Sequence, residues 1–150
     1  MVEAILDDGQ RLLALNEIFV GHASHQSARY TIEAPGSTER QSSSGIVVTT
    51  GTGATGWGRS ISLERHSAVA MPGPEEPALA YFVREAWPSV TSGATVTEGR
   101  LEAATPLGVR SEMNSGGVVF GDGIEADRLE FGFGRYLSVR VADQRLRLVS

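Results

Sequence analysis

The sequence contains no cysteine among its 150 residues. This absence excludes thiolate zinc sites, iron–sulfur clusters, cysteine nucleophiles and disulfide scaffolds. It fits a reducing compartment, and we expect a cytoplasmic protein. The three histidines leave few further ligands for transition metals, so we predict no metal site.

A basic excess and a long apolar segment are also missing. The net charge is −5, whereas nucleic-acid-binding domains normally carry a basic surface. No run approaches the roughly 18 apolar residues that span a bilayer, and the N-terminus has charges where a signal peptide is apolar. We therefore expect a soluble protein that binds neither nucleic acid nor membranes.

The length predicts a single domain over 1–150, large enough for its own core. Short segments rich in Val, Ile, Leu, Phe and Tyr alternate with turn-forming clusters of Gly, Asp, Asn and Pro, which is typical of consecutive β-strands. Strands are predicted over 2–6, 11–15, 18–20, 28–33, 46–50, 79–84, 94–103, 109–113, 118–120, 129–133, 136–141 and 145–149.

The segments between these strands differ in composition, and different structures are predicted for them. A polar loop is predicted over 35–44, a proline-rich loop over 71–77 and a hairpin turn, with a lid as the alternative, over 114–117. One short helix is predicted after residue 56, where apolar positions recur three to four apart. Many short strands with one helix predict an all-β fold of two packed sheets, like a β-sandwich.

The most informative segment runs from Gly45 to Trp57 and reads GIVVTTGTGATGW. It combines an apolar strand, a Gly/Thr turn and the start of the predicted helix. Glycines allow close approach of a ligand, threonine hydroxyls donate and accept hydrogen bonds, and a helix N-terminus presents free N–H groups. The alternative is a glycine-rich turn whose tryptophan packs in the core. The pattern alone leaves both open.

Three segments resemble the NAD kinase family. Residues 44–57, SGIVVTTGTGATGW, resemble the family signature that typically reads DGLIVSTPTGSTAY. Upstream, residues 14–18 (ALNEI) resemble the family's ALNE segment, and residues 118–125 (VVFGDGIE) resemble its late Asp-Gly turn. The matches keep the family's order and cover most of the chain, which implies the fold of the family's C-terminal, nucleotide-binding domain.

The resemblance also implies a function. Family members transfer the γ-phosphoryl group of ATP, or sometimes polyphosphate, to the 2′-hydroxyl of the adenosine ribose of NAD, with a divalent metal such as Mg²⁺, and produce NADP. They assemble through this domain, so a homodimer or homotetramer is expected. By position, contacts with NAD are implied for Asn16, Glu17, Thr52, Thr55, Gly56, Trp57 and Ser60.

Each implied contact suits its chemistry. Asn16 and Glu17 would contact adenine or ribose groups, because an amide reads both donors and acceptors and a carboxylate accepts from hydroxyls. The two threonines would bind the adenine edge, and Trp57 would take the place of the family's stacking tyrosine. On pattern alone, the alternative interpretation of Asn16-Glu17 is a turn at a strand end.

Two weaker candidates remain open. Asp122 aligns with a family aspartate near the nicotinamide end of the site, where it would be an auxiliary acid/base or metal-side carboxylate. The alternative for Asp122 is a plain Gly-Asp-Gly hairpin turn. His22 and His25 would share a metal only if a third ligand converged, and a solvated loop is the other interpretation.

The sequence departs from the family at several positions. Ser44 replaces an aspartate that reaches the neighbouring subunit's ligand, while Gly51, Ala54 and Gly56 replace Pro, Ser and Ala. The family's GGDGT motif, which holds phosphates and activates the 2′-hydroxyl, does not occur in these residues. We therefore expect ATP and metal binding only with an N-terminal α/β domain, and no turnover without it. The alternatives are a noncatalytic nucleotide-sensing or assembly module, and a kinase for a lipid or sugar acceptor.

Overall fold

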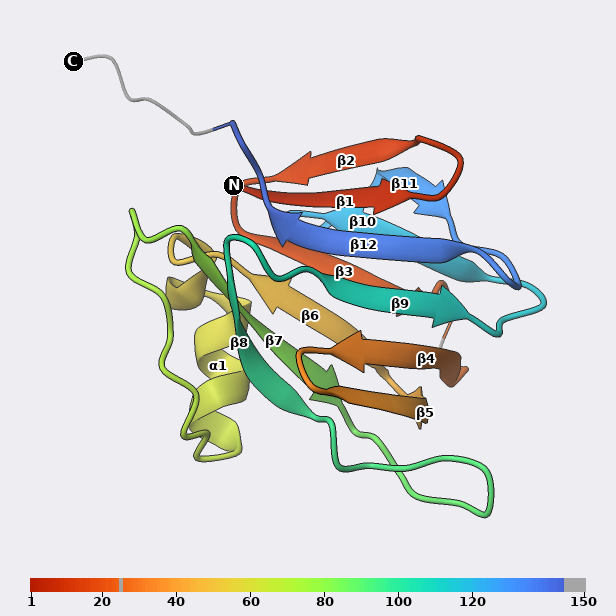
Figure 1. Ribbon diagram of the computed structural model, residues 1–150. Coiled ribbons are helices and arrows are strands. Elements are labelled where there is room, and N and C mark those ends of the chain that lie inside the picture. The colour runs from red at the N-terminus through yellow and green to blue at the C-terminus, as the bar shows by residue number, and fades with distance from the viewer. Residues whose placement is uncertain (25, 145–150) are drawn as a thin grey trace.

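The computed structural model describes residues 1–24 and 26–144. Two six-stranded sheets lie face to face, and every neighbouring pair of strands is antiparallel (Figure 1). The predicted all-β fold of two packed sheets is confirmed. No helix in the described part of the chain has the length and hydropathy that crossing a membrane would require.

The first sheet contains the earliest strand and the last strand of the described residues, and these two, β1 and β12, pair with each other. It is flanked on one side by the hairpin partner of β1 and on the other by a second hairpin. Its order is β2 (Arg11–Ala14), β1 (Val2–Leu6), β12 (Tyr136–Val141), β9 (Leu107–Ser111), β4 (Ala28–Ala34) and β5 (Ser37–Ser43).

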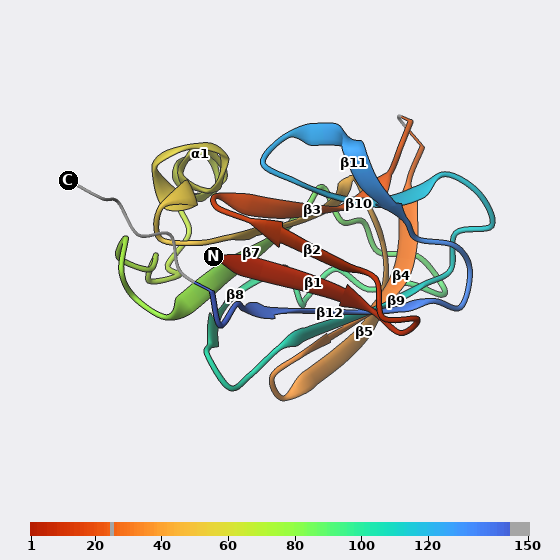
Figure 2. The ribbon, with the colours of Figure 1, turned by 90° about the horizontal axis from the view of Figure 1, so that it is seen from above.

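The second sheet is built around β6, whose five residues are all buried. Its order is β11 (Ile124–Glu130), β10 (Gly117–Gly121), β3 (Glu17–His22), β6 (Gly45–Thr49), β7 (Ala78–Arg84) and β8 (Glu98–Glu102). A 3-10 turn η1 (Gly53–Thr55) leads into α1 (Trp57–Glu64), the one α-helix of the described residues. As Figures 1 and 2 show, α1 lies on the outer side of this sheet, where Ile61 packs against Val47 and Phe82.

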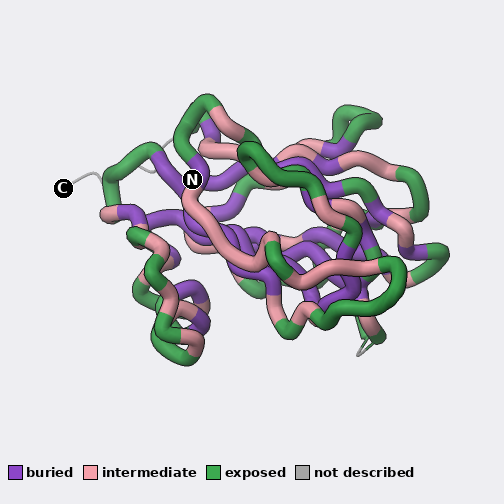
Figure 3. The backbone as a smooth tube through the Cα atoms, turned by 60° about the horizontal axis from the view of Figure 1, so that its bottom comes forward, coloured by how far each residue is buried: buried purple, intermediate pink, exposed green. Residues whose placement is uncertain are grey.

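The main core lies between the sheets, and Figure 3 shows the buried residues gathered in the middle of the molecule. Burial alternates along β4, where Ala28, Tyr30 and Ile32 are fully buried. The Tyr30 hydroxyl donates to Gln41 Oε1 at 2.8 Å and shares a hydrogen bond with Ser43 Oγ at 2.7 Å. Buried side-chain hydrogen bonds therefore link β4 to β5 at this edge of the core.

Removing this hydroxyl should destabilise the fold measurably. Tyr30→Phe leaves a buried acceptor on Gln41 without its donor, so we expect the free energy of unfolding to fall by about 1–2 kcal/mol. Urea denaturation followed by circular dichroism measures the change. Tyr136→Phe is the matched control, because that hydroxyl donates to Glu33 Oε2 at 2.7 Å near the surface. Equal losses in both variants would contradict a special role for the buried network.

Three predictions about elements are wrong. The segment 35–44 is not a loop, because Ser37–Ser43 forms β5 in a hairpin with β4. Its residues are polar, and it buries hydrogen-bonded groups instead of an apolar face, so hydrophobic alternation missed it. The 114–117 segment is not a hairpin turn, since it connects β9 of the first sheet to β10 of the second. The strand predicted over 129–133 is β11 at Ile124–Glu130.

The remaining predictions differ only in their ends or cannot be checked. The short helix and the irregular loop over 71–77 are confirmed. The strand expected over 94–103 is shortened to Glu98–Glu102, because the preceding residues lie beside Glu39 of β5 instead of pairing in the sheet. The strand predicted over 145–149 lies outside the described residues.

Candidate functional site

The three segments that carry the family resemblance meet at one end of the second sheet. β3 begins where β6 and β10 end, because it is antiparallel to both of these neighbours. Asn16 and Glu17 at the start of β3 therefore lie beside the Gly/Thr turn that follows β6. The turn between β10 and β11, which contains Asp122, lies on their other side.

Asp122 fixes the backbone at the start of β3. Its carboxylate accepts hydrogen bonds from the N–H groups of Leu15 at 2.8 Å, Asn16 at 2.7 Å and Glu17 at 3.3 Å. Its own N–H donates to the Glu17 carbonyl at 3.0 Å. Asp122 has a φ of 53°, which Asp tolerates better than most residues. The Gly-Asp-Gly hairpin turn is confirmed, and sequence reasoning missed the anchoring role of its carboxylate.

Thr50 fixes the Gly/Thr turn from the other side. Its hydroxyl donates to the Leu15 carbonyl at 2.7 Å and accepts from the Gly53 N–H at 3.0 Å. Its N–H donates to the Asn16 carbonyl at 2.9 Å. Sequence reasoning also missed Thr50, although a buried threonine just before a glycine-rich turn is a signal for such bonding. The segments around Asn16 and Gly53 therefore form one hydrogen-bonded unit.

Two glycines of the turn are required by close packing. A Cβ atom on Gly53 would lie 2.1 Å from the Asn16 carbonyl oxygen, and one on Gly51 would lie 1.7 Å from the Gly73 carbonyl oxygen. Both obstacles are backbone atoms, which cannot move aside as a side chain does. The departure from the family's proline at position 51 is thus explained by the packing of the 71–77 loop.

Three of the predicted contact residues, Asn16, Thr52 and Ser60, have polar side chains without a hydrogen bond among the described residues. Thr52, Thr55 and Ser60 are exposed and Asn16 is half-buried. Thr55 Oγ1 donates to the Thr52 carbonyl at 3.1 Å. Within residues 1–24 and 26–144, no hydrogen bond involves the side chains of Asn16, Thr52 or Ser60. These groups are available to a ligand, whereas those of Asp122 and Thr50 hold the backbone.

Glu17 is electrostatically coupled to the anchor. Partial burial raises the pKa of its carboxyl above the usual value, and the negative charge of Asp122 and a hydrogen bond to it raise the pKa further. A raised pKa in the folded state favours the protonated form, so the resulting stability is fully present below the unfolded pKa. It is lost as pH rises through the folded pKa.

Glu17→Gln should therefore change the pH dependence of stability. The amide is neutral at every pH and can donate to Asp122, so we expect the variant to be more stable than the parent near neutral pH. The difference should shrink as pH falls through the raised pKa of the folded state, and it should be gone below the ordinary glutamate value of 4.5. Thermal unfolding across this pH range measures it, and a difference that does not vary with pH would contradict the coupling.

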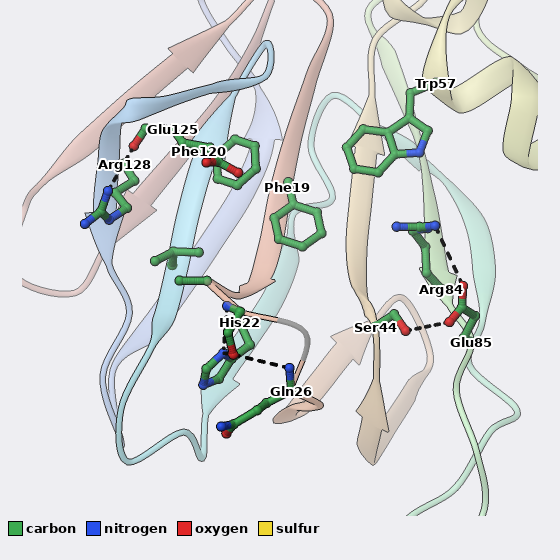
Figure 4. A pocket seen from close by; sticks show the side chains of 13 residues that line it. Phe19, His22, Gln26, Ser44, Trp57, Arg84, Glu85, Phe120, Glu125 and Arg128 are labelled. Atoms are coloured by element: carbon green, nitrogen blue, oxygen red, sulfur yellow. Dashed lines mark hydrogen bonds and ion pairs between the residues drawn. The ribbon is translucent and has the colours of Figure 1, made fainter.

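Two cavities flank the site, and they separate residues that the resemblance groups together. One, of about 490 Å³, is lined by Leu15, Thr50 and Thr52, and by the loop before β7. The other, of about 660 Å³, lies on the outer face of the second sheet and contains the Trp57 indole (Figure 4). Trp57 and Thr52 thus line different cavities.

The Trp57 ring already has contacts within the chain. It stacks on Phe19 with ring centroids 5.9 Å apart and planes 13° from parallel. The Arg84 guanidinium carbon lies 5.3 Å from its centroid. The sequence alternative, in which Trp57 packs in the core, is partly right, since the ring is half-buried against Phe19.

The histidine pair gives no support for a metal site. His22 Nδ1 accepts a hydrogen bond from the Ser24 N–H at 3.0 Å. His25 lies outside the described residues. Among the residues that are described, no group of three or more His, Cys, Asp or Glu side chains is arranged to hold a metal ion.

Comparison with known proteins supports the fold. No family model matches the sequence, and no curated protein matches it. Among solved structures, yeast NADH kinase, crystallised in complex with NADH, matches with a TM-score of 0.66 and 20% identity. The match covers 93% of this chain and 39% of the yeast chain. The chain thus spans about two fifths of that kinase and shares its fold over this part, so the NAD kinase-like fold is confirmed.

Proposed function

We propose that this chain is the NAD(H)-binding, C-terminal domain of an NAD kinase-like enzyme. That enzyme would phosphorylate the 2′-hydroxyl of the adenosine ribose of NAD and release NADP. The observation that carries the proposal is the convergence of Asn16, the Gly/Thr turn and Asp122 at one end of the second sheet. Each of these three segments resembles the family independently, and the fold brings all of them together.

The contacts are those that the resemblance implies by position, and each suits the chemistry of its residue. Asn16 and Glu17 bind adenine or ribose groups from the start of β3, and Thr52 and Thr55 bind the adenine edge from the turn. Gly56 allows the ligand to approach the helix start, where Ser60 offers another hydroxyl. Trp57 provides the stacking surface through the part of its ring that Phe19 leaves exposed.

The phosphoryl-transfer step needs groups beyond these residues. We propose that ATP and Mg²⁺ bind with an α/β domain that carries the GGDGT motif, and that this chain alone does not turn over. When bound, the metal would neutralise charge on the transferred phosphoryl group. This chain's part is to hold the acceptor ribose in place, because positioning dominates the catalysis of such transfers. We further propose a cytoplasmic homodimer or homotetramer.

Calorimetry with the full chain tests dinucleotide binding. We expect weak, saturable heat with NAD and NADH at millimolar concentration, and smaller heats with ADP and adenosine. Asn16→Ala and Thr55→Val should each weaken binding about tenfold, because each loses a hydrogen bond to a ligand that then leaves its own group unpaired. Arg29→Ala on the first sheet is the control. No saturable heat with any of the four compounds would contradict the pocket.

The same titration addresses the alternative acceptors. A kinase domain for a lipid or sugar would bind that acceptor and ignore NAD. Such an acceptor would be favoured by the departures from the family at Ser44 and Gly51, and the steric need for Gly51 removes the second of these arguments. Heat with a sugar or a lipid headgroup but none with NAD would replace the present proposal.

A further inference from the structure

The proline-rich segment 71–77, which we call the proline loop, borders the site at the end of the second sheet. It lies between α1 and β7 in the chain, in the yellow-green part of Figure 1. The cavity of about 490 Å³ that contains Thr52 is lined both by the Gly/Thr turn and by Pro74, Glu75 and Glu76 of this loop. The position of the loop therefore helps to determine the shape of that cavity.

The proline loop contacts the Gly/Thr turn at Gly73. A Cβ atom on Gly51 would lie 1.7 Å from the Gly73 carbonyl oxygen, so this carbonyl lies directly against the backbone of the turn. On its other side, the turn is fixed by the hydrogen bonds of Thr50 and by the close packing of Gly53 on Asn16. The Gly/Thr turn is therefore held between the start of β3 and the proline loop.

Glu76 holds Gly73 in this position. Its carboxylate oxygen Oε2 accepts a hydrogen bond from the Gly73 N–H at 3.0 Å, and its own N–H donates to the Gly73 carbonyl at 3.1 Å. The second carboxylate oxygen, Oε1, accepts a hydrogen bond from Arg100. The hydrogen bond from Arg100, and after it the one from Gly73, holds the pKa of the Glu76 carboxyl below its usual value. Glu76 is therefore charged at neutral pH.

Arg100 connects the proline loop to β8, the edge strand of the second sheet. Besides binding Glu76, its guanidinium donates to the carbonyl of Ala70, just before the loop, at 3.1 Å and to Glu102 Oε1 at 2.8 Å. One planar guanidinium thus binds both ends of the loop at once, which its several fixed donors make possible. The Glu102 side chain is 66% exposed and that of Glu76 is 42% exposed. Glu102 is thus the partner whose loss should matter less.

The contacts form a continuous path from β8 to the site. Arg100 binds Glu76, Glu76 fixes Gly73, and the Gly73 carbonyl lies against Gly51. Arg100 lines neither of the two cavities, so it acts through Glu76 and not on a ligand. Partly exposed ion pairs contribute little to global stability. The loss of this pair should therefore release the loop while the sheets stay folded.

We propose that Arg100 and Glu76 are positioning residues for the Gly/Thr turn. They fix Gly73, and Gly73 holds Gly51 and the following Thr52 in the conformation that binds the dinucleotide. This inference rests on the proposed function, because it concerns the same turn. When a turn is in its binding conformation for only part of the time, the dissociation constant rises in proportion. The pair therefore acts on affinity.

Calorimetric titration of the full chain with NADH measures this effect. We expect Arg100→Ala and Glu76→Ala each to raise the Kd about fivefold, and the double variant to raise it no further, because both changes break the same path. Arg100→Lys should recover part of the affinity, since an ammonium group reaches Glu76 but lacks the planar fork that also binds Ala70.

Glu102→Ala is the matched control. It removes a carboxylate that Arg100 also binds, but this carboxylate lies on β8 and not in the proline loop. The Kd for NADH should stay within about twofold of the parent value, because an exposed ion pair contributes little. A Glu102→Ala variant that loses as much affinity as Arg100→Ala would overturn the proposal, since the effect would then follow charge and not the loop.

Amide hydrogen exchange without ligand separates positioning from a general loss of stability. The N–H groups of Thr50, Gly53 and Ala54 are hydrogen-bonded in or beside the turn, and in Arg100→Ala they should exchange about fivefold faster than in the parent. Exchange in β4 and β12 should be unchanged, and the thermal midpoint should fall by less than about 4 °C. Uniformly faster exchange in both sheets would show a merely structural pair and would overturn the proposal.

The outcomes also distinguish this inference from the proposed function. If the parent chain binds NADH and Arg100→Ala binds it equally well, the positioning role is wrong and the dinucleotide role stands. If the parent chain gives no saturable heat with NADH, the dinucleotide role fails and hydrogen exchange alone decides. Faster exchange confined to the turn would then support the path from Arg100 to Gly51, and unchanged exchange would overturn it.

Discussion

Asp122→Ala should lower the free energy of unfolding by about 3 kcal/mol. Three backbone N–H groups lose their acceptor, and each half-buried donor left unpaired costs about 1 kcal/mol or more. Alanine at the φ of 53° adds strain that aspartate tolerates. The start of β3 would lose its anchor to the turn after β10. Urea denaturation measures the loss, and the affinity for NAD should fall with it.

Asp122→Asn separates the effect of the hydrogen bonds that Asp122 accepts from the effect of its negative charge. Asparagine tolerates the same backbone conformation and keeps one acceptor oxygen, so we expect about half of the loss seen with alanine. An alanine variant within about 0.5 kcal/mol of the parent would show that the three hydrogen bonds carry no net stability. The acid/base role of Asp122 stays a prediction. It would be supported if a variant kept its stability and lost only turnover in the two-domain enzyme.

Gly53→Ala should be comparably damaging, with a loss of about 2–4 kcal/mol. The added methyl group would lie 2.1 Å from the Asn16 carbonyl oxygen, so the turn or the start of β3 must move. This motion breaks the hydrogen bond from the Gly53 N–H to Thr50. We therefore expect binding of NAD to be lost even at temperatures where the variant is folded.

Gly132→Ala provides the matched control for this substitution. A Cβ atom there meets nothing within 4 Å, and its backbone is outside the left-handed region. We expect its stability to lie within about 0.5 kcal/mol of the parent. If Gly53→Ala were equally mild, the turn would not be packed against Asn16 in the way described.

Much of the fold could be predicted because most strands have an apolar inner face. β4 and β12 alternate clearly, and β6 is a continuous apolar run that suits a strand buried on both sides. β5 could not be predicted in this way, because Gln41 and Ser43 are buried through hydrogen bonds and not through apolar surface. The prediction of a hairpin turn over 114–117 was wrong for another reason. Glycine-rich turns look alike whether they join strands within a sheet or between sheets.

The sequence predicted which segments form the site, but it did not predict how these segments are arranged in space. Asn16, Thr52 and Asp122 are far apart in the sequence, and only the order of β3, β6 and β10 brings their segments together. The anchoring bonds of Asp122 and Thr50 go to backbone atoms, which no residue pattern specifies. The separation of Trp57 from Thr52 into two cavities likewise depends on where α1 packs on the sheet.

The most direct test of the dinucleotide site is a backbone amide NMR titration of the full chain with NADH. Binding at the end of the second sheet predicts the largest shift changes at residues 15–17 and 50–60, with smaller changes in the turn that contains Asp122. The strands of the first sheet should be unaffected. Saturable shift changes confined to the first sheet, or none at millimolar NADH, would contradict the account.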